Sequence, residues 1–116
     1  TTDERVIFVI GKYAALAVEE TTIPDEYSLN QNYPNPFNPT TRIQYSLPKA
    51  GLVQISIYTL MGQKIATLVN RNMDAGQYII TWHAMDDQGR KVPSGIYFYT
   101  LESGSYRAIK KLVLLK

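Results

Sequence analysis

The sequence predicts an all-β fold, an immunoglobulin-like antiparallel β-sandwich of about seven strands. Short runs of alternating apolar and polar residues recur between clusters of glycine and proline, and aromatic residues make up 11% of the 116 residues. Both features favour strands joined by tight turns. The chain contains no cysteine, so its one tryptophan and nine tyrosines must fill the space between the sheets without a disulfide.

The part of the chain before residue 33 lies outside the regular pattern. Residues 6–10 form a continuous apolar run, which predicts a strand that is buried on both faces or pairs with a partner. We expect residues 1–20 to be the tail of a preceding domain or a donor strand, although residues 13–20 fit a short helix equally well, and residues 21–32 to be a linker. The run is too short to span a bilayer and its flanks are too acidic for a signal peptide, so export would use a leader outside this sequence. The run consists of Val6, Ile7, Phe8, Val9 and Ile10.

A proline-rich stretch at residues 32–41 opens the regular part of the chain. Its three prolines fix φ and push the preceding residues towards extended geometry, so the stretch is neither a helix nor a central strand. We expect a rigid structural loop whose two aromatic side chains, Tyr33 and Phe37, pack onto the edge of the core. A ligand-binding loop is the alternative. The domain-opening residues are Tyr33, Pro34, Asn35, Pro36 and Phe37.

Three alternating strands are predicted after this loop. Residues 42–47 end at a proline, residues 52–58 place polar side chains on one face, and residues 64–69 continue across a small irregularity. The side chains expected to face the core are Val53, Ile55, Ile57, Ile65 and Leu68.

Three further strands, at residues 77–83, 96–101 and 106–116, complete the predicted sandwich. They are separated by turns rich in glycine, serine and aspartate. The register of the last strand is not defined by alternation, because two adjacent lysines precede a run of leucine and valine. The side chains expected to face the core are Tyr78, Ile80, Trp82, Tyr97, Tyr99 and Leu101.

The sequence carries no arrangement typical of an enzyme. His83 is the only histidine, and no serine elbow, paired histidines or glycine-rich phosphate loop accompanies it. We therefore expect no catalytic activity and no cofactor. Asp86 and Asp87, together with Asp74, have oxygen atoms that suit calcium, but their spacing differs from a helix–loop–helix calcium loop. Turn formation explains Asp86 and Asp87 without a metal, so we expect no metal site.

Charge is unevenly distributed along the chain. Residues 1–26 hold six acids and two bases, a net charge of −4, whereas residues 27–116 hold ten bases and four acids, a net charge of +6. The two parts would attract each other within a chain or between chains. Four of the bases lie near the C-terminus but alternate with leucines instead of gathering with exposed aromatics, so no nucleic-acid partner is expected. Lysines on an edge strand, which discourage aggregation, explain them better.

Four short motifs resemble the C-terminal sorting domain, type A, of proteins exported by the bacterial type IX secretion system. They are Tyr-Pro-Asn-Pro-Phe-Asn-Pro at 33–39, Gly-Gln-Tyr at 76–78, Pro-Ser-Gly-Ile-Tyr at 93–97 and Lys-Lys-Leu-Val-Leu-Leu-Lys at 110–116. The resemblance covers about residues 27–116 and places the sorting domain at residues 33–116. The middle of this region is also similar to the Ig-like domain of flagellar hook-capping proteins, which has the same sandwich.

This resemblance implies that the domain is a secretion signal. Such a domain folds in the periplasm, is recognised by the secretion machinery at the outer membrane and delivers its protein to the cell surface or the medium, with no membrane insertion of its own. The resemblance further assigns recognition to the terminal strand and the turn before its neighbour. The implied residues are Pro93, Gly95, Tyr97, Lys110, Lys111, Leu112, Val113, Leu114, Leu115 and Lys116. Turn formation, core packing and edge protection are the alternative roles of the same residues.

A structural role is the second hypothesis. Residues 5–18, joined by a linker to an open sandwich, would insert as a strand into a neighbouring copy, and repetition of this contact would build a homo-oligomer, a filament or a surface layer. The opposite charges of the two parts of the chain favour such an encounter. Carbohydrate adhesion would rest on the tyrosine content alone.

Overall fold

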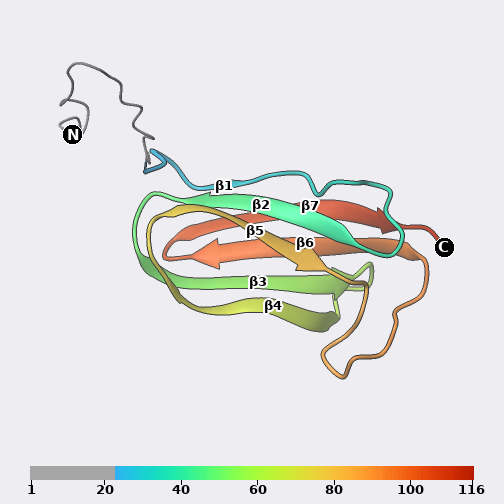
Figure 1. Ribbon diagram of the computed structural model, residues 1–116. Coiled ribbons are helices and arrows are strands. Elements are labelled where there is room, and N and C mark those ends of the chain that lie inside the picture. The colour runs from blue at the N-terminus through green and yellow to red at the C-terminus, as the bar shows by residue number, and fades with distance from the viewer. Residues whose placement is uncertain (1–22) are drawn as a thin grey trace, which may run out of the picture.

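Seven antiparallel strands form two sheets that pack face to face in the computed structural model, which describes residues 23–116 (Figure 1). The three-stranded sheet has the order β1-β2-β5 and the four-stranded sheet the order β4-β3-β6-β7. This architecture confirms the predicted all-β sandwich. The strands are β1 (Ser28–Leu29), β2 (Thr41–Leu47), β3 (Gly51–Thr59), β4 (Lys64–Met73), β5 (Gly76–Trp82), β6 (Gly95–Ser103) and β7 (Tyr106–Leu114).

The predictions for the first part of the chain concern residues outside the described range. They are the apolar strand at residues 6–10, the strand or helix at residues 13–20, and the donation of residues 5–18 to a second copy. These remain predictions.

The core between the sheets follows the predicted alternation on β3, β5 and β6. Side chains on these strands alternate between the core and the outer surface, because successive residues of a strand point to opposite faces. Tyr78 and Ile80 on β5 are half-buried and pack against the core. Fully burying one large apolar side chain stabilises the fold by about 1.5–3 kcal/mol. The buried members are Val53, Ile55, Ile57, Trp82, Tyr97, Tyr99 and Leu101.

On β4 the predicted Ile65 and Leu68 are half-buried and pack against the core, whereas the fully buried positions are Ala66 and Val69, which the sequence did not indicate. The register between β3 and β4 shifts twice, and each shift skips one residue of β4, first Leu68 and then Ile65 as β3 is followed along the chain. An extra residue in a bulge reverses the alternation beyond it. The sequence indicated an irregularity here, but its position depends on the pairing with β3.

The register of β7 is set by its pairing with β6. Leu112 lies opposite Tyr97, and both Leu112 and Leu114 are fully buried. Ile109, which is 62% exposed, and Lys111 are on the opposite face of the strand. The terminal strand therefore has an apolar inner face that belongs to the core and an outer face that reaches solvent.

The segment of residues 27–37, which we call the edge segment, joins the two sheets along one side. In the three-stranded sheet Leu29 pairs with Tyr45 of β2. At the other sheet the ring of Tyr27 stacks on that of Tyr106, at the start of β7, with centroids 4.7 Å apart. Leu29 and Asn32 are buried. Residues 27–32, which the sequence assigned to the linker, are therefore part of the sandwich.

The hydroxyl of Tyr99 holds the edge segment against the core. It accepts a hydrogen bond from the backbone N–H of Asn32 at 2.8 Å and donates one to the carbonyl of Asn30 at 2.6 Å. Burial of this fully enclosed side chain raises its pKa to about 12 from the ordinary value of 10.0. Neutral Tyr99 thus satisfies two backbone groups that would otherwise lack partners.

We expect the substitution Tyr99→Phe to lower the free energy of unfolding at pH 7 by about 1–3 kcal/mol, because the two backbone groups lose their partner. The raised pKa predicts a second effect. The stability contributed by neutral Tyr99 is present below pH 10, where both states are protonated, and is lost as the pH rises towards about 12. Urea unfolding, followed by Trp82 fluorescence, measures the free energy of unfolding at pH 7 and pH 11. This free energy should fall less between the two pH values in the variant than in the unchanged protein.

The control for this experiment is Tyr33→Phe, which changes a tyrosine that is 72% exposed. We expect it to alter the free energy of unfolding by less than about 0.5 kcal/mol. Equal stability of Tyr99→Phe and the unchanged protein at pH 7 would contradict the proposed role of the hydroxyl.

Candidate functional site

One end of the sandwich gathers three of the four sequence motifs. The loop after β1 at residues 33–40, which we call the opening loop, the loop between β5 and β6 and the end of β7 all lie at this end. The turns that follow β2, β4 and β6 lie at the other end (Figure 1). We call residues 33–40, 83–95 and 114–116 the signature end. The fourth motif, at residues 76–78, starts β5 at the opposite end.

The two aromatic side chains of the opening loop differ in burial. Phe37 is 2% exposed, as predicted, but Tyr33 is 72% exposed, so the expectation that both pack onto the core is wrong for Tyr33. The backbone of Tyr33 pairs with that of Arg42 and so extends the pairing between β1 and β2. Asn32 is buried at the preceding position, and the alternation of an extended chain then turns Tyr33 towards solvent.

An aromatic cluster ties the parts of the signature end together. Trp82, at the end of β5, lies 5.8 Å from the ring of Phe37 and 5.8 Å from the ring of Tyr97, with an edge-on arrangement towards Tyr97. Such pairs contribute about 0.5–1.5 kcal/mol beyond the burial of their area. The hydroxyl of Tyr97 donates a hydrogen bond to the carbonyl of Pro93 at 2.5 Å, and burial raises the pKa of Tyr97.

The opening loop also covers the outer edge of the terminal strand. The N–H of Phe37 donates to the carbonyl of Val113 at 2.9 Å, and the N–H of Leu115 donates to the carbonyl of Phe37 at 3.0 Å. The side chain of Asn35 accepts a hydrogen bond from the N–H of Val113 at 3.0 Å, and Gln31 donates to the carbonyl of Lys111 at 2.7 Å. The backbone edge at residues 111–115 is therefore occupied, and a partner that meets this part of β7 meets its side chains.

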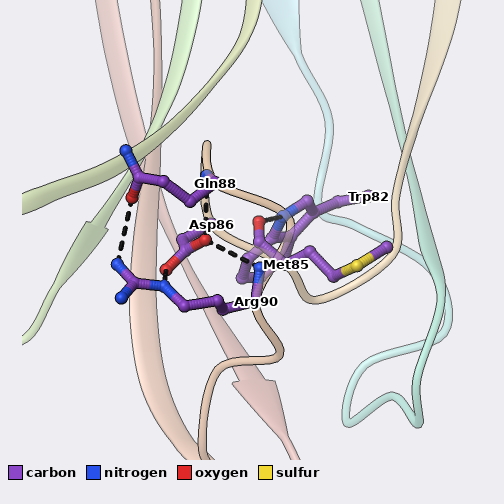
Figure 2. Close-up of polar contacts among 5 residues, drawn as sticks. All are labelled: Trp82, Met85, Asp86, Gln88 and Arg90. Carbon is purple, nitrogen blue, oxygen red and sulfur yellow. Dashed lines mark hydrogen bonds and ion pairs between the residues drawn. The ribbon is translucent and has the colours of Figure 1, made fainter.

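The loop between β5 and β6 is held in a defined shape. Ala84 is buried and has a φ of 60°, in the left-handed region that residues other than glycine rarely adopt. The N–H of Val92 donates to the carbonyl of Ala84 at 3.0 Å, and the indole N–H of Trp82 donates to the carbonyl of Met85 at 2.9 Å (Figure 2). Such backbone persists only where its surroundings enforce it.

Two aspartates complete this loop. Asp86 accepts hydrogen bonds from the backbone N–H groups of Gln88 and Arg90, and its second oxygen accepts one from the Arg90 side chain at 3.1 Å (Figure 2). These hydrogen bonds lower the pKa of Asp86, and the bond from the backbone N–H of Arg90 has the largest effect. Asp87 instead accepts from the N–H of Thr67 on β4 at 2.9 Å. The two carboxylates thus serve separate donors, and residues 23–116 contain no group of three side chains suited to hold a metal.

The comparisons with known proteins decide the family. The sequence profile described as the secretion system C-terminal sorting domain matches residues 31–115. The chain belongs to this family. The predicted resemblance to type IX sorting domains is therefore confirmed, and the chain carries a C-terminal sorting signal of that system. The family is one of sorting signals and not of enzymes.

Solved structures similar to this sorting domain support the fold. Dimeric latent PorU from Porphyromonas gingivalis is 17% identical with a TM-score of 0.61, over 75% of this chain and 9% of PorU. FlgD from P. aeruginosa is 21% identical with a TM-score of 0.50, over 64% of this chain and 58% of FlgD. The chain thus spans a small part of PorU and somewhat over half of FlgD. A comparison with curated proteins found no match.

The residues that the resemblance assigned to recognition fall into three groups in the sorting domain. Tyr97, Leu112 and Leu114 are buried in the core. Gly95, Lys110 and Val113 are half-buried. The exposed members are Pro93, Lys111, Leu115 and Lys116. His83 is also exposed, at the start of the loop after β5. No helix in residues 23–116 is long and apolar enough to cross a membrane.

Sequence reasoning missed one feature of the signature end, a groove of about 480 Å³ that we call the end groove. Its walls come from residues 38–40, 83–85, Lys91 and Lys116. These residues are distant in the sequence and meet only when the sandwich is closed. Lys91 lies outside the four motifs, and no pattern in the sequence marks it as a neighbour of Pro39.

The opening loop offers a matched pair of substitutions. We expect Phe37→Ala to lower the free energy of unfolding by about 3–5 kcal/mol, because a buried aromatic side chain leaves a cavity beside Trp82. Tyr33→Ala should change it by less than about 0.5 kcal/mol, because this side chain is exposed. Urea unfolding of both variants measures the difference. Equal losses would show that the loop is not anchored through Phe37.

The lowered pKa of Asp86 predicts a dependence of stability on pH. The ionised carboxylate stabilises the loop above its ordinary pKa of 3.8, and this contribution is lost as the pH falls through the lower folded value. Asp86→Asn should therefore lower Tm at pH 7. The difference in Tm between the variant and the unchanged protein should become smaller as the pH falls below 3.8. Thermal unfolding from pH 7 to pH 2 tests this. The exposed Asp74→Asn is the control, and a pH-independent difference for Asp86→Asn would count against the carboxylate.

Proposed function

We propose that this sorting domain is recognised by the type IX secretion machinery through the side chains exposed at the signature end and on the outer face of β7. The observation that supports the proposal is the convergence of three motifs at one end of the fold, held together by the aromatic cluster around Trp82. Loops that carry binding residues are commonly placed on a rigid scaffold in this way.

The burial of the implied residues divides their roles. Leu112, Leu114 and Tyr97 form the framework that positions the surface, because they are enclosed in the core. Lys111 and Leu115 are free to contact a partner; Leu115 is 53% exposed although it is large and apolar. An exposed leucine beside exposed lysines gives a partner both an apolar contact and positive charge.

The arrangement also bears on where recognition occurs. The motifs at residues 33–39, 93–97 and 110–116 are brought together by the closed sandwich, so the unfolded chain does not present the same surface. We infer that the domain folds in the periplasm before it is recognised at the outer membrane. Export to the cell surface or the medium follows from this recognition.

An export assay tests the proposal. The full chain is joined to a fluorescent protein directed to the periplasm of a bacterium that has this secretion system. We expect Lys111→Glu combined with Leu115→Ser to lower export by at least about tenfold, which corresponds to about 1.4 kcal/mol of lost recognition. Fluorescence on the cell surface and in the medium is the readout.

The matched control is Leu52→Ser, because Leu52 is 50% exposed on β3, away from the terminal strand. It should leave export unchanged. The Tm of each purified variant shows whether the domain still folds. Normal export of the double variant, with its fold intact, would contradict recognition through these two side chains.

A further inference from the structure

The end groove combines positive charge with apolar walls. Lys91, Lys116 and His83 line it together with the apolar side chains of Pro39, Ala84 and Met85. Asn38 and Thr40 add polar groups, and no carboxylate side chain is part of its lining. Its volume of about 480 Å³ lies in the range of sites that bind small molecules or short peptide segments.

The lysines of the end groove have no acidic partner within residues 23–116. The ion pairs of this part of the chain join Arg90 to Asp86 and Arg107 to Glu102. Asp86, the nearest acid in sequence to Lys91, is already engaged by Arg90. Within residues 23–116, therefore, no acidic side chain neutralises the side chains of Lys91 and Lys116, and this charge favours a negatively charged occupant.

The groove is also built before any occupant arrives. Ala84 in its lining is held at a φ of 60° by the hydrogen bond from Val92, and Met85 is held by the indole of Trp82. The backbones of Met85 and Lys91 lie opposite each other in an antiparallel bridge. A site that is already in its bound shape loses little conformational entropy on binding.

We propose that the end groove binds an acidic peptide segment of the secretion machinery. Carboxylates of this segment face Lys91 and Lys116, an adjacent apolar side chain packs on Pro39 and Met85, and Asn38 and Thr40 bond its backbone. A free phosphate would make no apolar contact with Pro39 and Met85, so it uses only part of the groove. The inference rests on the proposed function and adds Lys91, which the motifs do not include, as a residue that determines specificity.

A titration of the isotope-labelled full chain tests the proposal by nuclear magnetic resonance. The probe is the synthetic peptide acetyl-Asp-Leu-Glu-Phe-Asp-amide, compared with acetyl-Asn-Leu-Gln-Phe-Asn-amide. We expect the acidic peptide to shift the amide signals of Asn38, Thr40, residues 83–85 and Lys91, and the neutral peptide to bind at least about tenfold more weakly. Inorganic phosphate and vesicles of phosphatidylcholine with phosphatidylglycerol are tested in parallel.

The matched variants are Lys91→Glu and Lys49→Glu. Both reverse the charge of an exposed lysine, but Lys49 lies in the turn after β2, at the opposite end of the sandwich. We expect Lys91→Glu to weaken binding of the acidic peptide at least about tenfold and Lys49→Glu to change it by less than about twofold. Equal effects of the two variants would overturn the proposal and indicate a general attraction to the basic chain.

Three other results would also overturn it. Equal binding of both peptides would exclude recognition of carboxylates. The same shifts with phosphate or vesicles, but not with peptide, would indicate a different occupant. Concentration-dependent shifts without any probe, together with a dimer in light scattering, would place the acidic residues of a second copy in the groove.

The export assay separates this inference from the proposed function. We expect Lys91→Glu to lower export, whereas Lys49→Glu should not. If Lys111→Glu with Leu115→Ser blocks export and Lys91→Glu does not, the proposed function stands and the end groove is not the peptide site. If none of these variants affects export, recognition through the signature end fails as a whole.

Discussion

The pairing of the opening loop with the end of β7 is the interaction on which the rest of the structure depends. The exchange of backbone hydrogen bonds between Phe37 and residues 113–115 fixes the loop on the four-stranded sheet, while the same segment continues the pairing with β2 in the other sheet. One stretch of chain therefore belongs to both layers. Its aromatic anchor, Phe37, contacts Trp82, so the segment that covers the edge also contributes to the aromatic cluster of the signature end.

The loops of the signature end also cover both edges of the four-stranded sheet, β7 and β4. An unpaired edge strand offers backbone groups to any other chain, and natural sandwiches cover such edges. Here the opening loop and Gln31 cover the backbone at residues 111–115, so Lys111 lies on an edge that is already covered while its side chain is exposed. At the other edge of the sheet Asp87 makes a comparable contact with the backbone of β4. Both loops that reach over the sheet also build the signature end.

The sequence predicted what local alternation controls and missed what pairing controls. Alternation predicts the buried faces of β3 and β6, because each of these strands has one face towards the core and one towards solvent. On β4 the same rule did not identify the fully buried Ala66 and Val69, since the positions of the bulges are defined by the register with β3. Tyr33 and Phe37 look alike in the sequence, and only the pairing of Tyr33 with Arg42 distinguishes them. The motifs identified the family, but the end groove could not be predicted, because Lys91 and Pro39 become neighbours only through the tertiary fold.

The stacking of Tyr27 on Tyr106 determines where any preceding polypeptide enters the domain. The chain arrives beside the turn between β6 and β7, at the pole opposite the signature end (Figure 1). A nine-residue strand such as β7 is roughly 30 Å long, so about this distance separates the entry point of the chain from the signature end. Under the proposed function, a protein joined before the domain would therefore attach at the end of the sandwich opposite the recognised surface.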